Sequence, residues 1–275
     1  MAVIKAFLSI TAFLGNTLML VALRKVSSLH PPSKVLLRNL VATDLCVGLI
    51  TEPLSVIFLI SAVNENWKIC RYTVVFLSIT AYILNAVSLL TLTAISVDRL
   101  LALSLGMRYR QVVTFKRAFL IVVTFWAVST VFSTTQFLNV VIALWCGIMR
   151  TSFCLVTSTF SYSKIFLTLR HQQNQVQEEV QQRNQTNQLN ITRYRKVVYT
   201  TLWLQFMLLA CYLPQVILAT LFAIRAEPSS SVSLAFSLTT SLGFANSSLN
   251  PILYCCKVNE MRQAVKGTIR KMICF

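Results

Sequence analysis

The sequence predicts an all-α membrane protein, a bundle of seven transmembrane helices followed by an amphipathic helix on the membrane surface. Three observations support this fold class. Of the 275 residues, 56% are hydrophobic and only 12% are charged, about half the charged fraction of a typical soluble domain. Long apolar segments recur along the chain, and each can cross a hydrocarbon core of roughly 30 Å. Segments of this length satisfy their backbone hydrogen bonds as helices rather than as strands.

The predicted helices are long apolar runs bounded by polar or basic residues. They cover residues 2–23, 35–61, 70–103, 118–137, 140–169, 197–224 and 232–255. The fourth and fifth are the hardest to separate, because residues 118–169 form one apolar stretch without proline that is too long for a single crossing. Either residues 137–141 or residues 145–150 supply the turn, and we favour the first.

Basic residues are concentrated in alternate loops, which explains the net charge of +17 without a nucleic-acid partner. The opposite loops hold little beyond Lys68, Arg71 and Arg225. Because cytosolic loops carry an excess of Lys and Arg, we expect an extracellular N-terminus and a cytosolic C-terminus. The predicted location is the plasma membrane.

The chain ends in a basic, periodic segment. Apolar residues recur there every three or four positions, at Val258, Met261, Val265, Ile269 and Met272. This spacing predicts an amphipathic helix on the lipids of the inner leaflet. We therefore divide the chain into a transmembrane domain, residues 1–256, and a cytosolic helix and tail, residues 257–275. Cys274 is either a palmitoylation site or an unmodified tail cysteine.

Several polar residues lie at the depth of the membrane centre. Asp44 is placed midway along the second predicted helix, and its counterparts on other helices are Asn16, Ser88, Asn246, Ser247 and Asn250. A carboxylate with hydroxyl and amide oxygens suits a small hard cation. The same residues also suit a hydrogen-bonded core that fixes helix packing. The residues alone leave both interpretations open.

Asp98 and Arg99 end the third predicted helix near the cytosol. By themselves they are typical of an interfacial ion pair whose side chains extend toward water. Their neighbouring motifs favour a functional role.

Seven short motifs, in order, carry a resemblance to a known family. They are Gly15-Asn16, "NLVATD" (39–44), "DRL" (98–100), Trp126, Tyr162, "CYLP" (211–214) and "NPILY" (250–254). Each motif is weak alone, but together they make the chain resemble rhodopsin-like (class A) G protein-coupled receptors over essentially its whole length. Membership of that family implies an extracellular ligand, a heterotrimeric G protein and arrestin as partners.

The resemblance implies a role for each motif residue. The activation switch and G protein contact would comprise Asp98, Arg99, Tyr162, Tyr212, Pro214 and Tyr254. A sodium ion, the only bound cofactor expected, would be held by Asp44, Ser88, Asn246 and Asn250. At rest Arg99 would pair with Asp98, and movement of the sixth helix about Pro214 would free it.

Departures from the family pattern add further expectations. Tyr212 replaces the usual tryptophan, and residues 193–196 (RYRK) lack the acid that often pairs with the third-helix arginine. We therefore hypothesise elevated basal activity. A very short second outer loop and the absence of a fifth-helix proline resemble melanocortin receptors, without naming a ligand. Cys70 has no evident partner for the family disulfide.

The expected ligand is a peptide or small molecule. Ala81 stands where amine receptors carry an aspartate, and Phe244 where opsins carry the retinal-binding lysine, so a typical amine and retinal are both disfavoured. The candidate ligand-binding residues are Glu52, Tyr82, Asn85, Arg150 and Gln215. Glu52 and Arg150 either bind a zwitterion or peptide, or pair with each other.

Two other function classes remain as alternatives. A secondary transporter would use Asp44 and Glu52 as ion or proton sites, but it usually has internal repeats. A receptor-like protein that no longer signals is the second. An enzyme is not expected, because the only histidines, His30 and His171, both lie in cytosolic loops.

Overall fold

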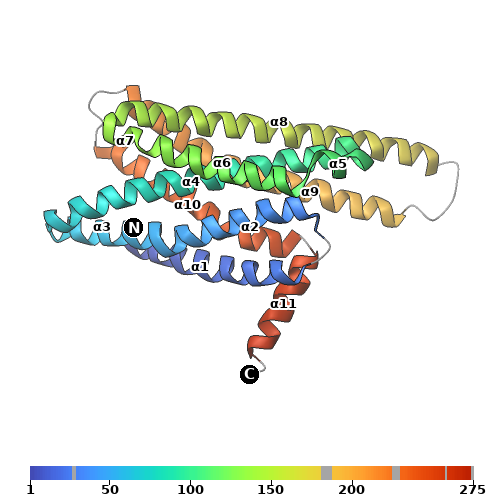
Figure 1. Ribbon diagram of the computed structural model, residues 1–275, viewed down its shortest axis with the longest axis horizontal. Helices are drawn as coiled ribbons and strands as arrows, with labels where there is room; N and C mark the ends of the chain where they lie inside the picture. The colour runs from blue at the N-terminus through green and yellow to red at the C-terminus, as the bar shows by residue number, and fades with distance from the viewer. Residues whose placement is uncertain (27–28, 181–187, 225–229, 258, 274–275) are drawn as a thin grey trace.

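The structure is a computed structural model that describes residues 1–26, 29–180, 188–224, 230–257 and 259–273. Within these residues the regular elements are helices, most of them aligned along one axis as a bundle (Figure 1). The last helix leaves the bundle at a steep angle. The predicted all-α fold is confirmed.

The elements follow one another in the order of the predicted crossings. They are α1 (Ala2–Lys25), α2 (Pro31–Cys46), the π-helical turn η1 (Val47–Thr51), α3 (Glu52–Val63), α4 (Trp67–Leu105), η2 (Gly106–Arg108), α5 (Tyr109–Val112), α6 (Phe115–Ser133), α7 (Thr135–Leu138), α8 (Val140–Val180), α9 (Gln188–Ile224), α10 (Ser230–Lys257) and α11 (Asn259–Ile273). The second crossing comprises α2, η1 and α3, and the fourth comprises α6 and α7.

Six described helical segments are long and apolar enough to span a membrane. The seventh crossing is α10, whose 28 residues would extend about 42 Å at 1.5 Å per residue. It packs against both α1 and α9. The chain is therefore a seven-helix membrane bundle.

Asn139 makes the turn between the fourth and fifth crossings. Its backbone is extended (φ −159°, ψ 115°) between α7 and α8. Its side-chain Oδ1 accepts hydrogen bonds from the backbone N–H groups of Val141 (2.8 Å) and Ile142 (3.3 Å), which satisfies two orphan donors at the start of α8. The favoured turn at residues 137–141 is confirmed, and the alternative at residues 145–150 is wrong.

The second crossing changes register at η1. Pro53 lies in the first turn of α3 and has no N–H to donate to the preceding turn. A π-turn accommodates this break by inserting one residue. The carbonyl of Gly48 accepts a hydrogen bond from Ser9 Oγ on α1 (2.7 Å). A Cβ on Gly48 would lie only 2.9 Å from the backbone nitrogen of Phe13, so glycine allows this close approach.

The seventh crossing is fastened to the first at a second proline. Pro251 cannot donate to the carbonyl of Ser247, four residues earlier in α10. Asn16 Nδ2 donates to that carbonyl instead, at 3.0 Å. A Cβ on neighbouring Gly15 would lie 3.0 Å from Pro251 Cγ. Gly15 and Asn16 therefore let the two helices meet where α10 lacks one of its own hydrogen bonds.

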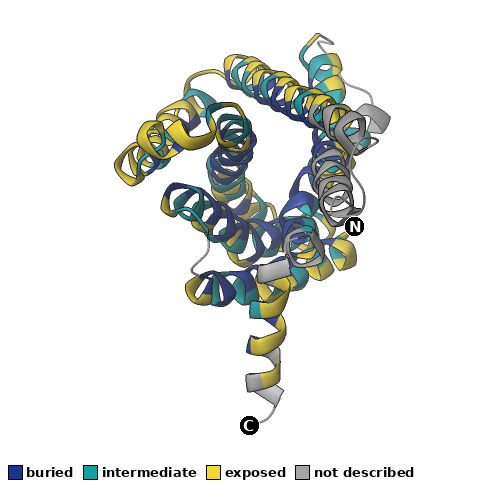
Figure 2. Ribbon diagram, turned by 90° about the vertical axis from the view of Figure 1, so that its right-hand side faces the viewer, coloured by how far each residue is buried: buried dark blue, intermediate teal, exposed yellow. Residues whose placement is uncertain are grey.

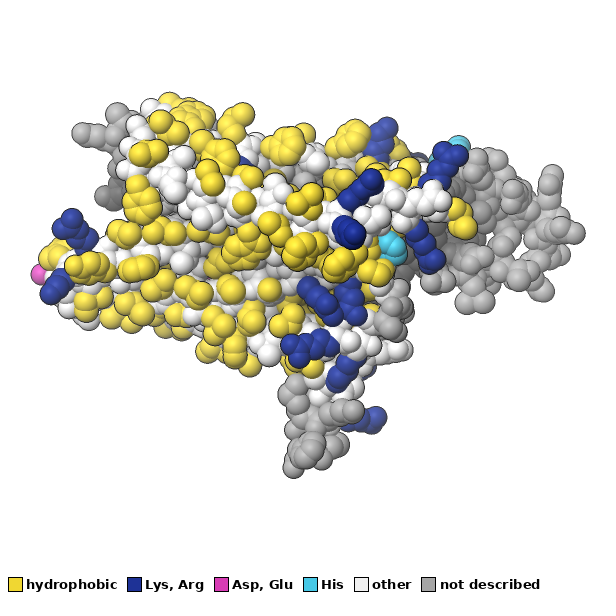
Figure 3. Space-filling view, in the orientation of Figure 1, with side chains coloured by type: hydrophobic (Ala, Val, Ile, Leu, Met, Phe, Trp, Pro, Cys, Tyr) yellow, Lys and Arg dark blue, Asp and Glu magenta, His cyan; other side chains and the backbone are white. Residues whose placement is uncertain are grey.

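The surface is divided as a membrane protein requires. Exposed hydrophobic side chains cover the flank of the bundle, and Lys and Arg gather at the end from which α11 leaves (Figure 3). We call this the basic end; it includes Arg24, Lys25 and Arg99. Seen from this end, buried residues line the interior and exposed residues lie on the outer rim (Figure 2).

The terminal helix α11 is held against the basic end. Lys25 Nζ donates to Thr268 Oγ1 at 2.8 Å, and Val265 is buried in the main hydrophobic core. The helix predicted in this segment is confirmed, while Val258 and Cys274 lie outside the described residues.

Candidate functional site: a buried polar centre between a cavity and a basic surface

Asp44 is the centre of a buried hydrogen-bond network. Its side chain is fully buried. Oδ1 accepts from Ser88 Oγ (3.0 Å) and Ser247 Oγ (2.8 Å), and Oδ2 accepts from Asn250 Nδ2 (2.8 Å). Three donors from α4 and α10 thus stabilise a carboxylate of α2 that would otherwise be costly in an apolar interior.

The structure brings together three of the four residues assigned to a sodium ion. Asp44, Ser88 and Asn250 share one network, whereas the fourth, Asn246, has a buried Nδ2 without a hydrogen-bond partner among the described residues. Ser247 is a further member of the Asp44 network. It was recognised as polar at this depth, but only the α10 register shows that it bonds Asp44 directly. The oxygen atoms of these side chains fit a hard cation.

Asp98 is bonded to groups other than its neighbour. Oδ2 accepts from Ser33 Oγ (2.7 Å), and Oδ1 accepts from Tyr109 OH (2.7 Å). Arg99 is exposed at the basic end and forms no ion pair with any residue that the structure describes. The expected pairing of Asp98 with Arg99 is therefore wrong. Adjacent helical positions point about 100° apart, and Asp98 turns toward α2 and α5.

The other switch residues lie on the fifth to seventh crossings. Tyr162 is buried against Ile165 and Leu169 near the basic end. Tyr212 is almost fully buried in the main core, and Pro214 lies inside α9. The side chains of Tyr254 and of residues 193–196 lie outside those that the structure describes.

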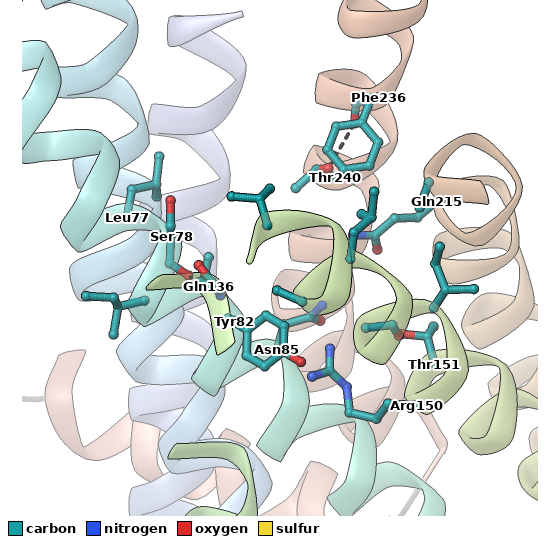
Figure 4. A pocket seen from close by; sticks show the side chains of 18 of the residues that line it. Leu77, Ser78, Tyr82, Asn85, Gln136, Arg150, Thr151, Gln215, Phe236 and Thr240 are labelled. Carbon is teal, nitrogen blue, oxygen red and sulfur yellow. Dashed lines mark hydrogen bonds between the residues drawn. The ribbon is translucent and has the colours of Figure 1, made fainter. Parts of the chain in front are cut away.

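A cavity of about 590 Å³ opens at the end of the bundle opposite the basic end. Its walls come from α4, α7, α8, α9 and α10. Four of the five ligand-binding candidates line it: Tyr82, Asn85, Arg150 and Gln215. Figure 4 shows the Arg150 guanidinium beside Tyr82 and Asn85, with Gln215 across the cavity. Ala81 and Phe244 also contribute to its wall.

Glu52 is not part of this cavity. It is buried in α3, where Ser55 Oγ bonds its backbone carbonyl (2.7 Å) and lies 3.4 Å from Oε2. The opposite charge that acts on it is Lys5 of α1. The alternative pairing of Glu52 with Arg150 is wrong, and Glu52 lies apart from the other four ligand-binding candidates, because the π-turn η1 changes the direction in which α3 presents its residues.

Arg150 lies over an aromatic ring. Its Cζ is 4.6 Å from the centroid of the Tyr82 ring, a cation–π contact. Its Nε is buried and has no hydrogen-bond partner among the described residues. Sequence reasoning identified this arginine, but it could not show that the ring fixes the side chain in the cavity.

The described cysteines are all free, including Cys70 at the cavity end. Cys255, Cys256 and Cys274 lie outside the described side chains.

Comparison with known proteins places these features in context. A family model described as "7 transmembrane receptor (rhodopsin family)" matches residues 15–157 and 138–254. The human adenosine receptor A2b is 25% identical over 94% of this chain and 87% of its own length. The sheep adenosine receptor A3 is 23% identical over 94% of this chain and 86% of its own length. The human 5-hydroxytryptamine receptor 1E is 32% identical, over 42% of this chain and 30% of its own length.

Proposed function

Because the chain belongs to the rhodopsin family of seven-transmembrane receptors, we propose that it binds an extracellular ligand and activates a heterotrimeric G protein. Its relatives are receptors and not enzymes, and a transporter has no support among them. The family match, which spans almost the whole bundle, is the observation that carries this proposal.

We propose that the basic end faces the cytosol and the cavity end faces outward. The concentration of Lys and Arg at the basic end supports this orientation. Residues 1–256 would then form the receptor domain in the plasma membrane, and residues 257–275 a cytosolic helix on the inner leaflet. The amphipathic sequence of α11 and its contact with α1 support that division.

The ligand would occupy the cavity of α4, α8, α9 and α10. Tyr82, Asn85, Arg150 and Gln215 line it, whereas Ala81 offers no carboxylate to an amine. The names of the relatives point to two different ligands, adenosine and 5-hydroxytryptamine. At these sequence identities neither ligand is assigned to this chain, and each serves only as a probe in a binding test.

The activation switch would connect the two ends through Asp44. Ligand binding would shift α9 about Pro214, with Tyr212 and Tyr162 repacking, so that Arg99 meets the G protein. Sodium held by Asp44 and its hydroxyl and amide neighbours would favour the resting conformation. Agonist and sodium would then act on one equilibrium in opposite directions.

The resting restraint on Arg99 would be weak in this chain. Asp98 is engaged by Ser33 and Tyr109, and residues 193–196 contain no acid. We therefore propose elevated basal activity, with Tyr254 completing the contact in the active state. Arrestin would use the same cytosolic surface.

The test is nucleotide exchange on a panel of G proteins, in membranes containing the receptor or none. The expected result is exchange above the empty membranes before any ligand is added. Arg99→Ala should abolish it, whereas Arg24→Ala, at another exposed arginine of the basic end, should not. Exchange equal to that of empty membranes, with and without a ligand panel, would mean that the protein does not signal in this way.

A further inference from the structure

The described wall of the cavity carries a single formal charge. Arg150 is the only ionisable side chain of the Asp, Glu, Lys or Arg type among its described lining residues. The other polar groups there are neutral amides and hydroxyls, such as Asn85, Gln136 and Gln215. A site for a positively charged ligand would need an acid in this wall, and the described wall has none.

Neither nearby carboxylate neutralises Arg150. Asp44 is fully buried and accepts hydrogen bonds from Ser88, Ser247 and Asn250. Glu52 lies outside the cavity wall and interacts with Lys5. Arg150 forms no ion pair within the described part of the chain. A cation held in an apolar wall without a counter-charge is costly, and an anion that enters the cavity would remove that cost.

Arg150 is positioned to receive such an anion. The Tyr82 ring, 4.6 Å from Cζ, holds the guanidinium plane, and Nε remains without a partner. A planar guanidinium can bind a carboxylate through two parallel hydrogen bonds, and Nε of Arg150 is an N–H without a partner among the described residues. Asn85 lies beside it (Figure 4) and makes no hydrogen bond to another described residue, so its amide can donate a further bond.

Most of the remaining cavity wall is apolar, with scattered neutral amides and hydroxyls. Both α4 and α8 start at the cavity end, so Asn85 and Arg150 lie deeper than Val75 and Val140 on the same helices. Between the deep polar group and the mouth, the wall is formed largely by Leu, Ile, Val, Ala and Phe side chains. A ligand that fits this order has a charged head and a hydrophobic body.

We infer that the ligand is an organic monoanion, a carboxylate with an apolar body, whose carboxylate binds Arg150 and Asn85 at the deep end of the cavity. This inference rests on the proposed function only in taking the cavity as the ligand site. It names the chemistry of the ligand, and it makes Arg150 the residue that selects for negative charge.

Binding can be measured on the purified receptor in nanodiscs without any G protein, as a rise in the melting temperature. The probes are decanoate, which is flexible, and 1-naphthylacetate, which is rigid. Each is compared with its methyl ester and with the amine of the same skeleton. We expect at least one carboxylate to raise Tm, and its ester and amine to have no effect.

Variants of two arginines locate the effect. Arg150→Gln should weaken carboxylate binding at least about tenfold, because it removes a charge-assisted two-bond contact, and Arg150→Lys should retain part of the affinity. Arg71→Gln is the matched control, since Arg71 is an exposed cation at the cavity end and outside the cavity wall. It should leave the affinity unchanged.

The inference is overturned if neither carboxylate raises Tm, if an ester matches its acid, or if Arg150→Gln binds the acid as tightly as the wild type. The inference would also be overturned if both carboxylates fail and adenosine, which is neutral, raises Tm equally in the wild type and in Arg150→Gln. Should Arg150→Gln not fold, the comparison of acid with ester on the wild type still decides. A carboxylate that binds but never changes nucleotide exchange would contradict the proposed signalling function instead.

Discussion

The protein treats the two aspartates of the bundle interior and the arginine of the cavity wall differently. Asp44 and Asp98 accept hydrogen bonds from side chains of other helices, three at Asp44 and two at Asp98. Arg150, in the cavity wall, has an unbonded Nε and no described acid beside it. A charged side chain whose hydrogen-bonding groups are all used within the protein stabilises the bundle or its switch. A charged side chain that keeps unused donors is available to bind a ligand.

The largest expected effect comes from removing the most fully bonded charge. Asp44→Ala leaves Ser88, Ser247 and Asn250 without their acceptor. We expect a loss of about 3 kcal/mol of unfolding free energy, since each buried unsatisfied group costs about 1–3 kcal/mol. Thermal unfolding in nanodiscs measures this. Asp44→Asn keeps one acceptor oxygen and should lose less; equal losses in both variants would mean that the hydrogen bonds do not stabilise the bundle.

Asn16→Ala tests a neutral bond of the same buried network. The substitution leaves the Ser247 carbonyl, already deprived of its helical donor by Pro251, without a partner. We expect a loss of about 1–2 kcal/mol in the same unfolding measurement. Thr17→Ala is the control, because Thr17 Oγ1 bonds only the Phe13 carbonyl of its own helix. A Thr17 variant as unstable as the Asn16 variant would remove the special role of the α1–α10 contact.

Tyr109→Phe tests whether the Asp98 carboxylate can be freed from one of its hydrogen bonds. The change frees Asp98 Oδ1, which can then attract Arg99. We expect basal nucleotide exchange to fall about fivefold, the effect of roughly 1 kcal/mol of coupling. Tyr72→Phe, at an exposed tyrosine of the cavity end, should leave basal exchange unchanged. An increase in exchange would show that Tyr109 restrains the resting state instead.

Glu52→Gln should have the smallest effect on ligand binding. The side chain lies outside the cavity, so potency in the exchange assay should change less than about twofold, because a residue that does not touch the ligand makes no differential contact with it. Arg150→Gln in the same assay provides the contrast. A large loss of potency in the Glu52 variant, at normal surface expression, would place Glu52 in contact with the ligand.

The sequence predicted much of the fold because membrane helices can be recognised from their length and composition. The seven crossings and the turn near Asn139 followed from apolar runs, whereas the grouping of Asp44 with Ser88 and Asn250 followed from the resemblance to the receptor family. Four of the five candidate ligand-binding residues line the cavity, since their depth along each helix could be counted.

The errors arose where the direction of a side chain depended on another helix. Asp98 bonds Ser33, 65 positions earlier in the chain, and no local pattern joins the two. Ser247 was not assigned to Asp44 because the rotation of α10 is set by its packing on α1. Glu52 was placed in the cavity on the assumption of a continuous second helix, which η1 interrupts.

The π-turn at Val47–Thr51 has an evolutionary consequence. One inserted residue rotates everything after it by about 100° relative to an unbroken α-helix, and here it presents Glu52 to α1. Loss of a single codon in this segment would re-aim the whole of α3 without altering the chemistry of any side chain. Shortening this turn by one residue would therefore redirect α3, none of whose residues line the cavity here.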